Sequence, residues 1–312
     1  MKIRNQKPKG GTELQLEYLS KYVDKDLLDK VQITTSVPEK IPLHPTKPNI
    51  LWQKNSWDQP NIFPWFNDPK NTPKYDMYVF NSHWNLEQFR KKFKMPLDRC
   101  TVIKNGIDDI PVRKPYQEGE PIKLIHHCTP WRGLSVLLGA MQLVKSNVTL
   151  DVYSSCEVYG KDFAEKNDPQ YEGLYEQAKQ LKNVNYIGYR PNSYIKENLK
   201  NYHMFAYPSI WEETSCISAI ESMAAGLYCL ITDLGALYET CAEYALYVPY
   251  DNNYRALSQK FAYAIDAVVP TLSDPSLHAH LMLQSEYARK YYGWPKQALN
   301  WTQTLKGLIN AK

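Results

Sequence analysis

The stretch MFAYPSIWEETSCISAIESMAAG, residues 204–226, decides the fold. Its first four residues, Met204–Tyr207, are apolar or aromatic, which is typical of a buried strand. A polar turn follows, and the apolar spacing after it predicts a helix that begins near Ser215 or Cys216. The apolar face of this helix would consist of Ile217, Ile220 and Ala224. A strand, a turn and a helix in this order form the repeating unit of a parallel sheet covered by helices.

The same rhythm continues on both sides of this stretch. Strands are predicted at residues 31–36, 49–53, 77–81 and 101–104, and then at 123–127, 149–154, 184–188, 228–232 and 246–248. Helices are predicted at residues 12–22 and 83–93, and then at 134–144, 193–199, 216–225, 254–269, 276–291 and 296–309. Pro295 is expected to separate the last two helices. The second half is therefore predicted to be a doubly wound α/β sheet, which binds ligands beyond the carboxyl ends of its strands.

Size and charge limit the class of protein. The 312 residues suffice for two domains, and Ile110–Gly119, which is polar and contains two prolines, is the best candidate for a linker. A net charge of +4 does not by itself indicate a nucleic-acid partner. Two basic clusters are interpreted as solvated faces, with weak peripheral contact to phosphates or a membrane surface as the alternative. They are Lys2, Arg4, Lys7 and Lys9, and the segment Arg90–Lys94.

The cysteines and the N-terminal residues bear on where in the cell the protein is located. None of the six cysteines lies in a C-x-x-C pair, so neither a zinc site nor a redox dithiol is indicated. The start MKIRNQKPKGGTE has no apolar core of a secretory signal, and no run approaches the roughly 20 apolar residues of a membrane span. These features predict a cytoplasmic protein.

The turn after the predicted strand at 204–207 offers two carboxylates and a helix start. The first backbone N–H groups of a helix lack partners and suit a phosphate, here at Ser215, Cys216 and Ile217. Glu213 precedes the helix and would reach sugar hydroxyls, whereas Glu221 would accept hydrogen bonds from a ribose diol. Two alternatives remain open: Glu213 as an exposed turn acid, and Glu221 as the last member of a capping box that starts at Ser218.

At this point the sequence resembles glycosyltransferase family 4, whose members have the GT-B fold. That family carries Pro-Ser, then two glutamates separated by seven residues, and then a Met-Ala-x-Gly helix end. This chain has Pro208-Ser209, Glu213, Glu221 and Met223-Ala-Ala-Gly226. The resemblance implies that Glu213 contacts the donor sugar and that Glu221 contacts the ribose of the nucleotide. Family members usually have glycines where Thr214, Ser215 and Cys216 stand here.

A second match is His127-Cys-Thr-Pro-Trp-Arg-Gly-Leu134, after the predicted strand at 123–127. The family places an Arg and a Lys here to bind the donor diphosphate. The resemblance implies that Arg132 takes the Lys position and that His127, with Thr129 beside it, lies near the Arg position. The alternative for His126 and His127 is that both are buried strand residues. Gly188-Tyr189-Arg190 stands where the base of the nucleotide packs in the family.

The N-terminal half carries weaker matches. Gly10-Gly11 before Thr12 allows close backbone approach to a ligand, or simply starts a helix that Thr12 caps. In the family a similar loop follows the first strand and faces the cleft, but Lys2–Asn5 is a poor strand, so that strand is interpreted as short or missing. The family often has a histidine after the strand predicted at 49–53, and this chain has Lys54 there. Val102–Asp108 resembles the element that ends the first domain.

The resemblance implies two Rossmann-like doubly wound domains that face each other across a cleft. They would span residues 1–112 and 120–294, and residues 295–312 would form a helix that packs back on the first domain. The expected reaction moves a sugar, with retention, from a nucleoside-diphosphate sugar to a hydroxyl of a glycan or other acceptor, without cofactor or metal. Asp24-Lys-Asp26 has the D-x-D spacing of a metal motif and is interpreted as surface. The alternatives are a GT-B-fold sugar-nucleotide epimerase and a non-catalytic sugar-nucleotide-binding protein.

Overall fold

A computed structural model describes residues 9–311 of the chain. The chain folds into two compact units, which are described separately. Unit 1 holds Asp109–Trp211 and Ser218–Arg289 with residues 9–10, and unit 2 holds Gly11–Asp108, Glu212–Ile217 and residues 290–311. The segment expected to be a linker thus belongs to unit 1, where the backbone N–H of Arg113 donates to the Ala225 carbonyl. Residues 212–217 and 290–294, expected in the second domain, belong instead to unit 2.

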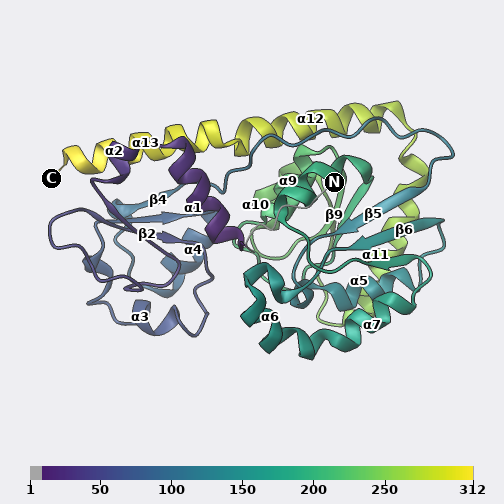
Figure 1. The fold of residues 1–312 in the computed structure, drawn as a ribbon, viewed down its shortest axis with the longest axis horizontal. Helices are drawn as coiled ribbons and strands as arrows, with labels where there is room; N and C mark the ends of the chain where they lie inside the picture. The colour runs from purple at the N-terminus through teal and green to yellow at the C-terminus, as the bar shows by residue number, and fades with distance from the viewer. Residues whose placement is uncertain (1–8, 312) are drawn as a thin grey trace. The chain divides into compact units, whose positions relative to one another are not determined.

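Unit 1 is a six-stranded parallel sheet with helices on it (Figure 1). The strands are β5 (Ile122–His126), β6 (Val148–Val152), β7 (Val184–Tyr186), β8 (Met204–Tyr207), β9 (Tyr228–Thr232) and β10 (Leu246–Val248), in the order β10-β9-β8-β5-β6-β7. The helices are α5 (Leu134–Met141), α6 (Lys161–Asn167), α7 (Glu172–Gln180), α8 (Asn192–Asn198), α9 (Ile217–Ala224), α10 (Leu237–Cys241), α11 (Tyr254–Val268) and α12 (Pro275–Tyr292). The order reverses between β5 and β8, so their carboxyl ends form the switch point of a doubly wound sheet.

The core of unit 1 lies between this sheet and the helices α5 and α11, which pack against each other. Strand β5 alternates little, with only Lys123 exposed, as expected for a strand covered on both faces. Helix α11 begins at Asn253, whose side chain caps the backbone N–H groups of Arg255 and Ala256. None of the helices within residues 9–311 is both long and apolar enough to cross a membrane.

Unit 2 is a four-stranded parallel sheet in the order β1-β2-β3-β4. The strands are β1 (Gln32–Thr35), β2 (Asn49–Gln53), β3 (Met77–Phe80) and β4 (Cys100–Val102), and the helices are α1 (Gly11–Tyr22), α2 (Lys25–Leu28), α3 (Phe63–Asn67), α4 (His83–Lys92) and α13 (Trp294–Asn310). Helices α1 and α13 lie together and share a core with β2, in which Trp52 meets Trp301 edge-on at 4.8 Å. A second core, rich in Phe and Tyr, packs α3 and α4 against the sheet.

The break between α12 and α13 differs from the prediction. Helix α13 begins at Trp294, so Pro295 lies inside its first turn, where proline is tolerated because that N–H has no helical partner. The interruption is Gly293, with φ −57° and ψ 137°. Ile107 stabilises it by donating its N–H to the Tyr292 carbonyl and accepting from the N–H of Trp294. A pair of backbone hydrogen bonds, rather than proline, therefore separates the two helices.

Most predicted elements are present within two or three residues of their expected ends. Helix α9 begins at Ile217, so Ser215 and Cys216 precede it instead of starting it. Asp24 of the D-x-D sequence caps the short helix α2 by accepting from the backbone N–H of Asp26. The predicted poor strand Lys2–Asn5 lies outside the described residues. The mixed α/β fold with parallel sheets confirms the predicted fold class.

Candidate functional site

The strand ends at the switch point of unit 1 bring two predicted loops together. Strand β5 pairs with β8 through Leu124–Met204 and Ile125–Phe205, so the loops that follow His126 and Tyr207 leave the sheet side by side. Gly133 closes the first loop with φ +103°, a conformation that favours glycine. A Cβ atom at Gly133 would lie 2.0 Å from the carbonyl oxygen of Pro208. The Arg132 loop therefore packs directly on the Pro208-Ser209 turn, and only glycine permits the contact.

The two histidines at the end of β5 have different surroundings. His126 is fully buried, and burial lowers the pKa of its imidazole to about 4. His127 is partly exposed, its Nε2 lies 3.1 Å from Oγ of Ser222, and burial lowers its pKa to about 3. Its carbonyl accepts a hydrogen bond from Oγ of Ser218, which joins the loop to α9. At neutral pH both rings are uncharged, so His127 can offer a hydrogen bond but not a positive charge.

The rest of this loop offers a cation and a hydroxyl. Arg132 is partly exposed at the end of a 3-10 turn, Pro130–Arg132, and its N–H donates to the Thr129 carbonyl. The Thr129 side chain is buried, and its Oγ1 has no hydrogen-bond partner within residues 9–311. A buried hydroxyl without a protein partner suits a polar ligand atom.

Glu221 is a buried carboxylate inside α9, four residues after its start. Both carboxylate oxygens accept from the amide Nδ2 of Asn192, at 3.0 and 3.2 Å. Ser218, which the capping-box alternative requires before the helix, lies within it and donates to the His127 carbonyl. The capping-box alternative is therefore wrong. The helix and Asn192 fix a buried acid where it can accept hydrogen bonds from a ligand.

The predicted base-binding loop follows β7. Gly188 has φ +72°, and the guanidinium of Arg190 folds back onto its own loop, donating to the carbonyls of Ile187 and Tyr189. Desolvation raises the pKa of the Tyr189 phenol. Asn192 starts the next helix, α8, so this loop and Glu221 are coupled through one amide.

Glu213 lies in the segment Glu212–Ile217, which belongs to unit 2. The Glu213 side chain is only 4% exposed, so the alternative of an exposed turn acid is wrong. Its neighbour Thr214 donates from Oγ1 to the Lys54 carbonyl at 2.8 Å and accepts from Nδ2 of Asn81 at 3.0 Å. The Ser215 carbonyl accepts from Nδ2 of Asn105 at 3.2 Å. Glu213 itself forms a backbone bridge, and side-chain hydrogen bonds rather than a helix hold the residues that follow it.

The glycine pair Gly10-Gly11 lies at the start of α1 and is in contact with the protein itself. Gly10 is buried, and a Cβ atom at Gly11 would approach Cδ1 of Ile217 to 3.2 Å. Helix α1 begins at Gly11, one residue before Thr12, which is partly exposed. Close backbone approach therefore occurs at Gly11, toward the protein's own isoleucine.

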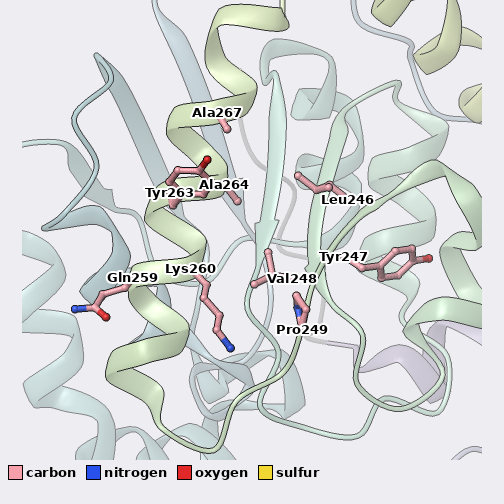
Figure 2. Close-up of a pocket in the computed structure, with 9 residues that line it drawn as sticks. All are labelled: Leu246, Tyr247, Val248, Pro249, Gln259, Lys260, Tyr263, Ala264 and Ala267. Carbon is pink, nitrogen blue, oxygen red and sulfur yellow. The ribbon is translucent and has the colours of Figure 1, made fainter.

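A separate groove lies between β10 and α11 of unit 1, and it contains none of the predicted site residues (Figure 2). It has a volume of about 500 Å³ and a largely apolar lining. Its one lysine, Lys260, forms an ion pair with Asp251 at 2.9 Å. The lining residues are Leu246, Tyr247, Val248, Pro249, Gln259, Lys260, Tyr263, Ala264 and Ala267.

Sequence reasoning missed several residues that hold the site together. Asn192 was not singled out, although an Asn after Pro191 at a helix start was a visible signal. Asn105 was noted only as part of the segment Val102–Asp108, yet it is 4% exposed and hydrogen-bonded on both sides of its amide. Gly133 could have been found as the glycine that follows the predicted phosphate-binding arginine.

The sequence of unit 1 identifies the family. Residues 109–268, just over half of the chain, match the model of the glycosyl transferases group 1. The chain belongs to this family. No curated protein matches the sequence. The matched residues include the switch-point loops of unit 1.

Solved structures resemble this glycosyltransferase in fold. A glycosyltransferase from Rickettsia africae aligns over 100% of this chain and 85% of its own, with a TM-score of 0.68 and 16% identity. The sucrose-phosphate synthase of Thermosynechococcus elongatus covers 85% of this chain and 68% of its own, with a TM-score of 0.67 and 19% identity. HepE of Anabaena, in complex with UDP and glucose, covers 84% and 72%, with a TM-score of 0.65 and 16% identity. These likenesses establish the GT-B fold.

Proposed function

We propose that this glycosyltransferase is a retaining enzyme of the family 4 type. It would transfer a hexosyl group from a nucleoside-diphosphate sugar to an acceptor hydroxyl, without metal or cofactor. The observation that carries the proposal is the buried Glu221 carboxylate, held by Asn192 beside the switch-point loops of unit 1. An acid fixed in this way accepts from both hydroxyls of a ribose, which an apolar or cationic side chain cannot do.

The same unit supplies the groups for the rest of the nucleotide. Arg132 would bind the diphosphate, because a guanidinium offers two parallel hydrogen bonds to phosphate oxygens. The neutral His127 and the hydroxyl of Thr129 would add hydrogen bonds there. The loop Gly188, Tyr189 and Arg190 would contact the base. Ser215, Cys216 and Ile217, which lead into α9, would present backbone N–H groups to the phosphates.

The chemistry follows from where charge develops. The bond between the anomeric carbon and the diphosphate oxygen breaks, and negative charge grows on the leaving diphosphate. A preorganised cation such as Arg132 stabilises that charge without reorganisation at the moment of reaction. Glu213 would orient the sugar, and the acceptor oxygen would bond to the anomeric carbon on the face that the diphosphate leaves. The acceptor hydroxyl passes its proton to the departing diphosphate oxygen on the same face, so that the products are the glycosylated acceptor and a protonated nucleoside diphosphate.

The ligands bound by the structural neighbours suggest the first ligand to test. HepE has been solved with UDP and glucose and with UDP-glucose, and a pneumococcal O-GlcNAc transferase, GtfA, with UDP and GlcNAc. UDP and its sugars are therefore the first candidates for this chain.

The test is release of nucleotide. Wild type should release UDP, or another nucleoside diphosphate, from at least one sugar donor in a panel. Arg132→Ala, Glu213→Ala and Glu221→Ala should each lower the turnover by at least about 100-fold, the cost of one transition-state contact. Glu212→Ala, which changes the adjacent acid, is the matched control and should retain most activity. Unchanged turnover in all three variants would contradict the proposal.

Other results of this test would point to the alternatives. Interconversion of two sugar nucleotides without release of nucleotide would indicate the epimerase. Binding of nucleotide sugar without turnover across many acceptors would indicate a non-catalytic binding protein. Lys54 in place of the usual histidine is the observation that keeps this last alternative in view.

The location and the membrane contact stay predictions. Of the two basic clusters, Lys2, Arg4 and Lys7 lie outside the described residues. In the other, Arg90, Lys91, Lys92 and Lys94 are exposed at the end of α4, and Lys92 lies 4.5 Å from the ring centre of Trp57. This surface is the place to test for binding to anionic vesicles.

A further inference from the structure

Lys54 occupies an unusual place for a lysine. It is the first residue after β2, and its Nζ lies 3.9 Å from the ring centre of Trp52, a fully buried side chain of the unit 2 core. Nζ donates to Oδ1 of Asn105 at 2.7 Å. Desolvation lowers the pKa of the amine well below its ordinary value, although the nearby Glu13 carboxylate acts in the opposite direction.

The Lys54 side chain is partly exposed, and its Nζ lies over an aromatic ring. No carboxylate of the described chain lies within ion-pair distance of Nζ. Partial desolvation of an amine is unfavourable, and the hydrogen bond to Asn105 and the face of Trp52 offset that cost. A methionine of similar length would fill the same space on Trp52 without that penalty. What the lysine adds to such packing is the hydrogen bond to Asn105.

Its contacts lead to the segment that contains Glu213. Asn105 accepts from Lys54 with Oδ1 and, through Nδ2, donates to the Ser215 carbonyl. The carbonyl of Lys54 accepts from Oγ1 of Thr214. Lys54 thus holds two consecutive residues, one directly through its backbone and one through the Asn105 amide. Nζ of Lys54 also fixes which way the Asn105 amide points, because only the amide oxygen can accept a hydrogen bond from it.

We propose that Lys54 is a positioning residue, which acts through Asn105 and its own carbonyl to hold Thr214 and Ser215, and so places Glu213 for the sugar half of the donor. The inference rests on the proposed function for the ligand. On this view, Lys54 stands where the resembling family often has a histidine, and its amine positions the segment 212–217 instead of contacting the nucleotide. Loss of the amine should loosen this segment while the nucleotide contacts of unit 1 stay intact.

The first experiment needs no ligand. Hydrogen exchange of Lys54→Met should be about tenfold faster in peptides that cover residues 212–217, since the loss of about one hydrogen bond increases local opening by that order. Peptides that cover residues 218–226 should exchange as in wild type. Lys74→Met, which removes an exposed lysine of the same unit that pairs with Glu39, is the matched control and should leave both regions unchanged.

The second experiment compares UDP with UDP-glucose, UDP-galactose and UDP-N-acetylglucosamine by calorimetry. Lys54→Met should bind UDP as wild type does and lose most of the additional affinity that the sugar provides, about tenfold. Lys54→Arg, which keeps a cation and a donor above Trp52, should recover most of it. Asn105→Ala should reproduce the effect, and the double variant should be no worse than either single one, because both act along one chain of contacts.

The results separate the two proposals. The role of Lys54 is contradicted if Lys54→Met shows wild-type hydrogen exchange and wild-type affinity for all ligands. It is also contradicted if this variant loses UDP and UDP-sugar affinity equally. A wild type that binds UDP but gains nothing from any of the sugars also overturns it. A wild type that binds no nucleotide contradicts the proposed function instead, and the exchange experiment then still decides whether Lys54 holds the segment.

Discussion

Glu213 and Glu221 are close in sequence, yet different neighbours hold them. Glu221 lies inside α9, and one amide, that of Asn192 in the same unit, bridges both of its oxygens. Glu213 lies in a segment without helix, where side chains of Asn81 and Asn105 and the carbonyl of Lys54 hold the residues that follow it. Glu221 is thus fixed within a helix on the sheet, whereas side-chain hydrogen bonds hold the residues that follow Glu213.

This difference teaches where such a chain can vary. Substitutions around Glu221 disturb a buried helix that follows a central strand of the sheet, so we expect them to lower the free energy of unfolding. Changes around Thr214–Cys216, where the resembling family usually has glycines, alter only which side chains hold the loop. We expect donor sugar specificity to reside in the second region.

The largest effect is expected in unit 1, from a substitution in the loop that carries Arg132. Gly133→Ala would place a Cβ atom 2.0 Å from the Pro208 carbonyl at a φ of +103°. We expect a loss of about 3 kcal/mol or more in the free energy of unfolding, from overpacking added to backbone strain, together with loss of nucleotide binding. Denaturant unfolding measures the first, and calorimetry with UDP the second.

Gly119→Ala is the matched control for this prediction. Gly119 also has positive φ, +89°, but no atom lies within 4 Å of the Cβ position. Backbone strain alone should cost about 1–2 kcal/mol. Equal effects at the two glycines would show that the Pro208 contact does not position the Arg132 loop.

The next largest effect is expected from low pH, which should lower the free energy of unfolding through the buried imidazole of His126 at the end of β5. Burial lowers the pKa of His126 to about 4, whereas the unfolded chain titrates near 6.5. Between these values the unfolded chain binds more protons, so the free energy of unfolding should fall as the pH falls, by on the order of 3 kcal/mol in total. Unfolding at pH 7, 5.5 and 4 checks this. His127, whose pKa burial lowers to about 3, adds a dependence of the same sign, so His126→Asn should remove only the share of His126. An unchanged slope would contradict this share.

A smaller effect is expected from the asparagine that holds Glu221. Asn192→Ala removes the amide that bridges the carboxylate and should weaken UDP binding about 3- to 10-fold, because the acid is no longer oriented. Asn185→Ala is the matched control: Asn185 also donates to an acid, Asp151, but in an exposed position. Calorimetry with UDP compares them. Equal affinities would mean that Asn192 does not prepare the nucleotide site.

Much of the fold could be predicted because strands and helices carry their own periodicity. Strands such as β2, β8 and β9 were predicted to the residue, since each is a short apolar run between turn residues. Short helices such as α3 and α10, with only five residues each, have too few turns to show a helical repeat and were missed. Residues 212–217 belong to unit 2 because of hydrogen bonds to residues far away in sequence, which no local pattern encodes.

The candidate site was predicted unevenly for the same reason. The two-glutamate spacing and the Arg132 loop were readable because each follows a strand end directly. The supporting asparagines at 105 and 192 were not, because an asparagine in a turn or at a helix start has an ordinary local explanation. Their partners lie 110 and 29 residues away in sequence.

Calorimetric titration of UDP into Glu221→Gln and Glu213→Gln tests the difference between the two acids most directly. Both substitutions keep the shape of the side chain and remove its charge. We predict that Glu221→Gln loses about 10- to 100-fold in UDP affinity, the usual cost of a charged hydrogen bond, while Glu213→Gln binds UDP as wild type does. Wild-type UDP affinity in Glu221→Gln, or an equal loss in both variants, would contradict the assignment of Glu221 to the nucleotide.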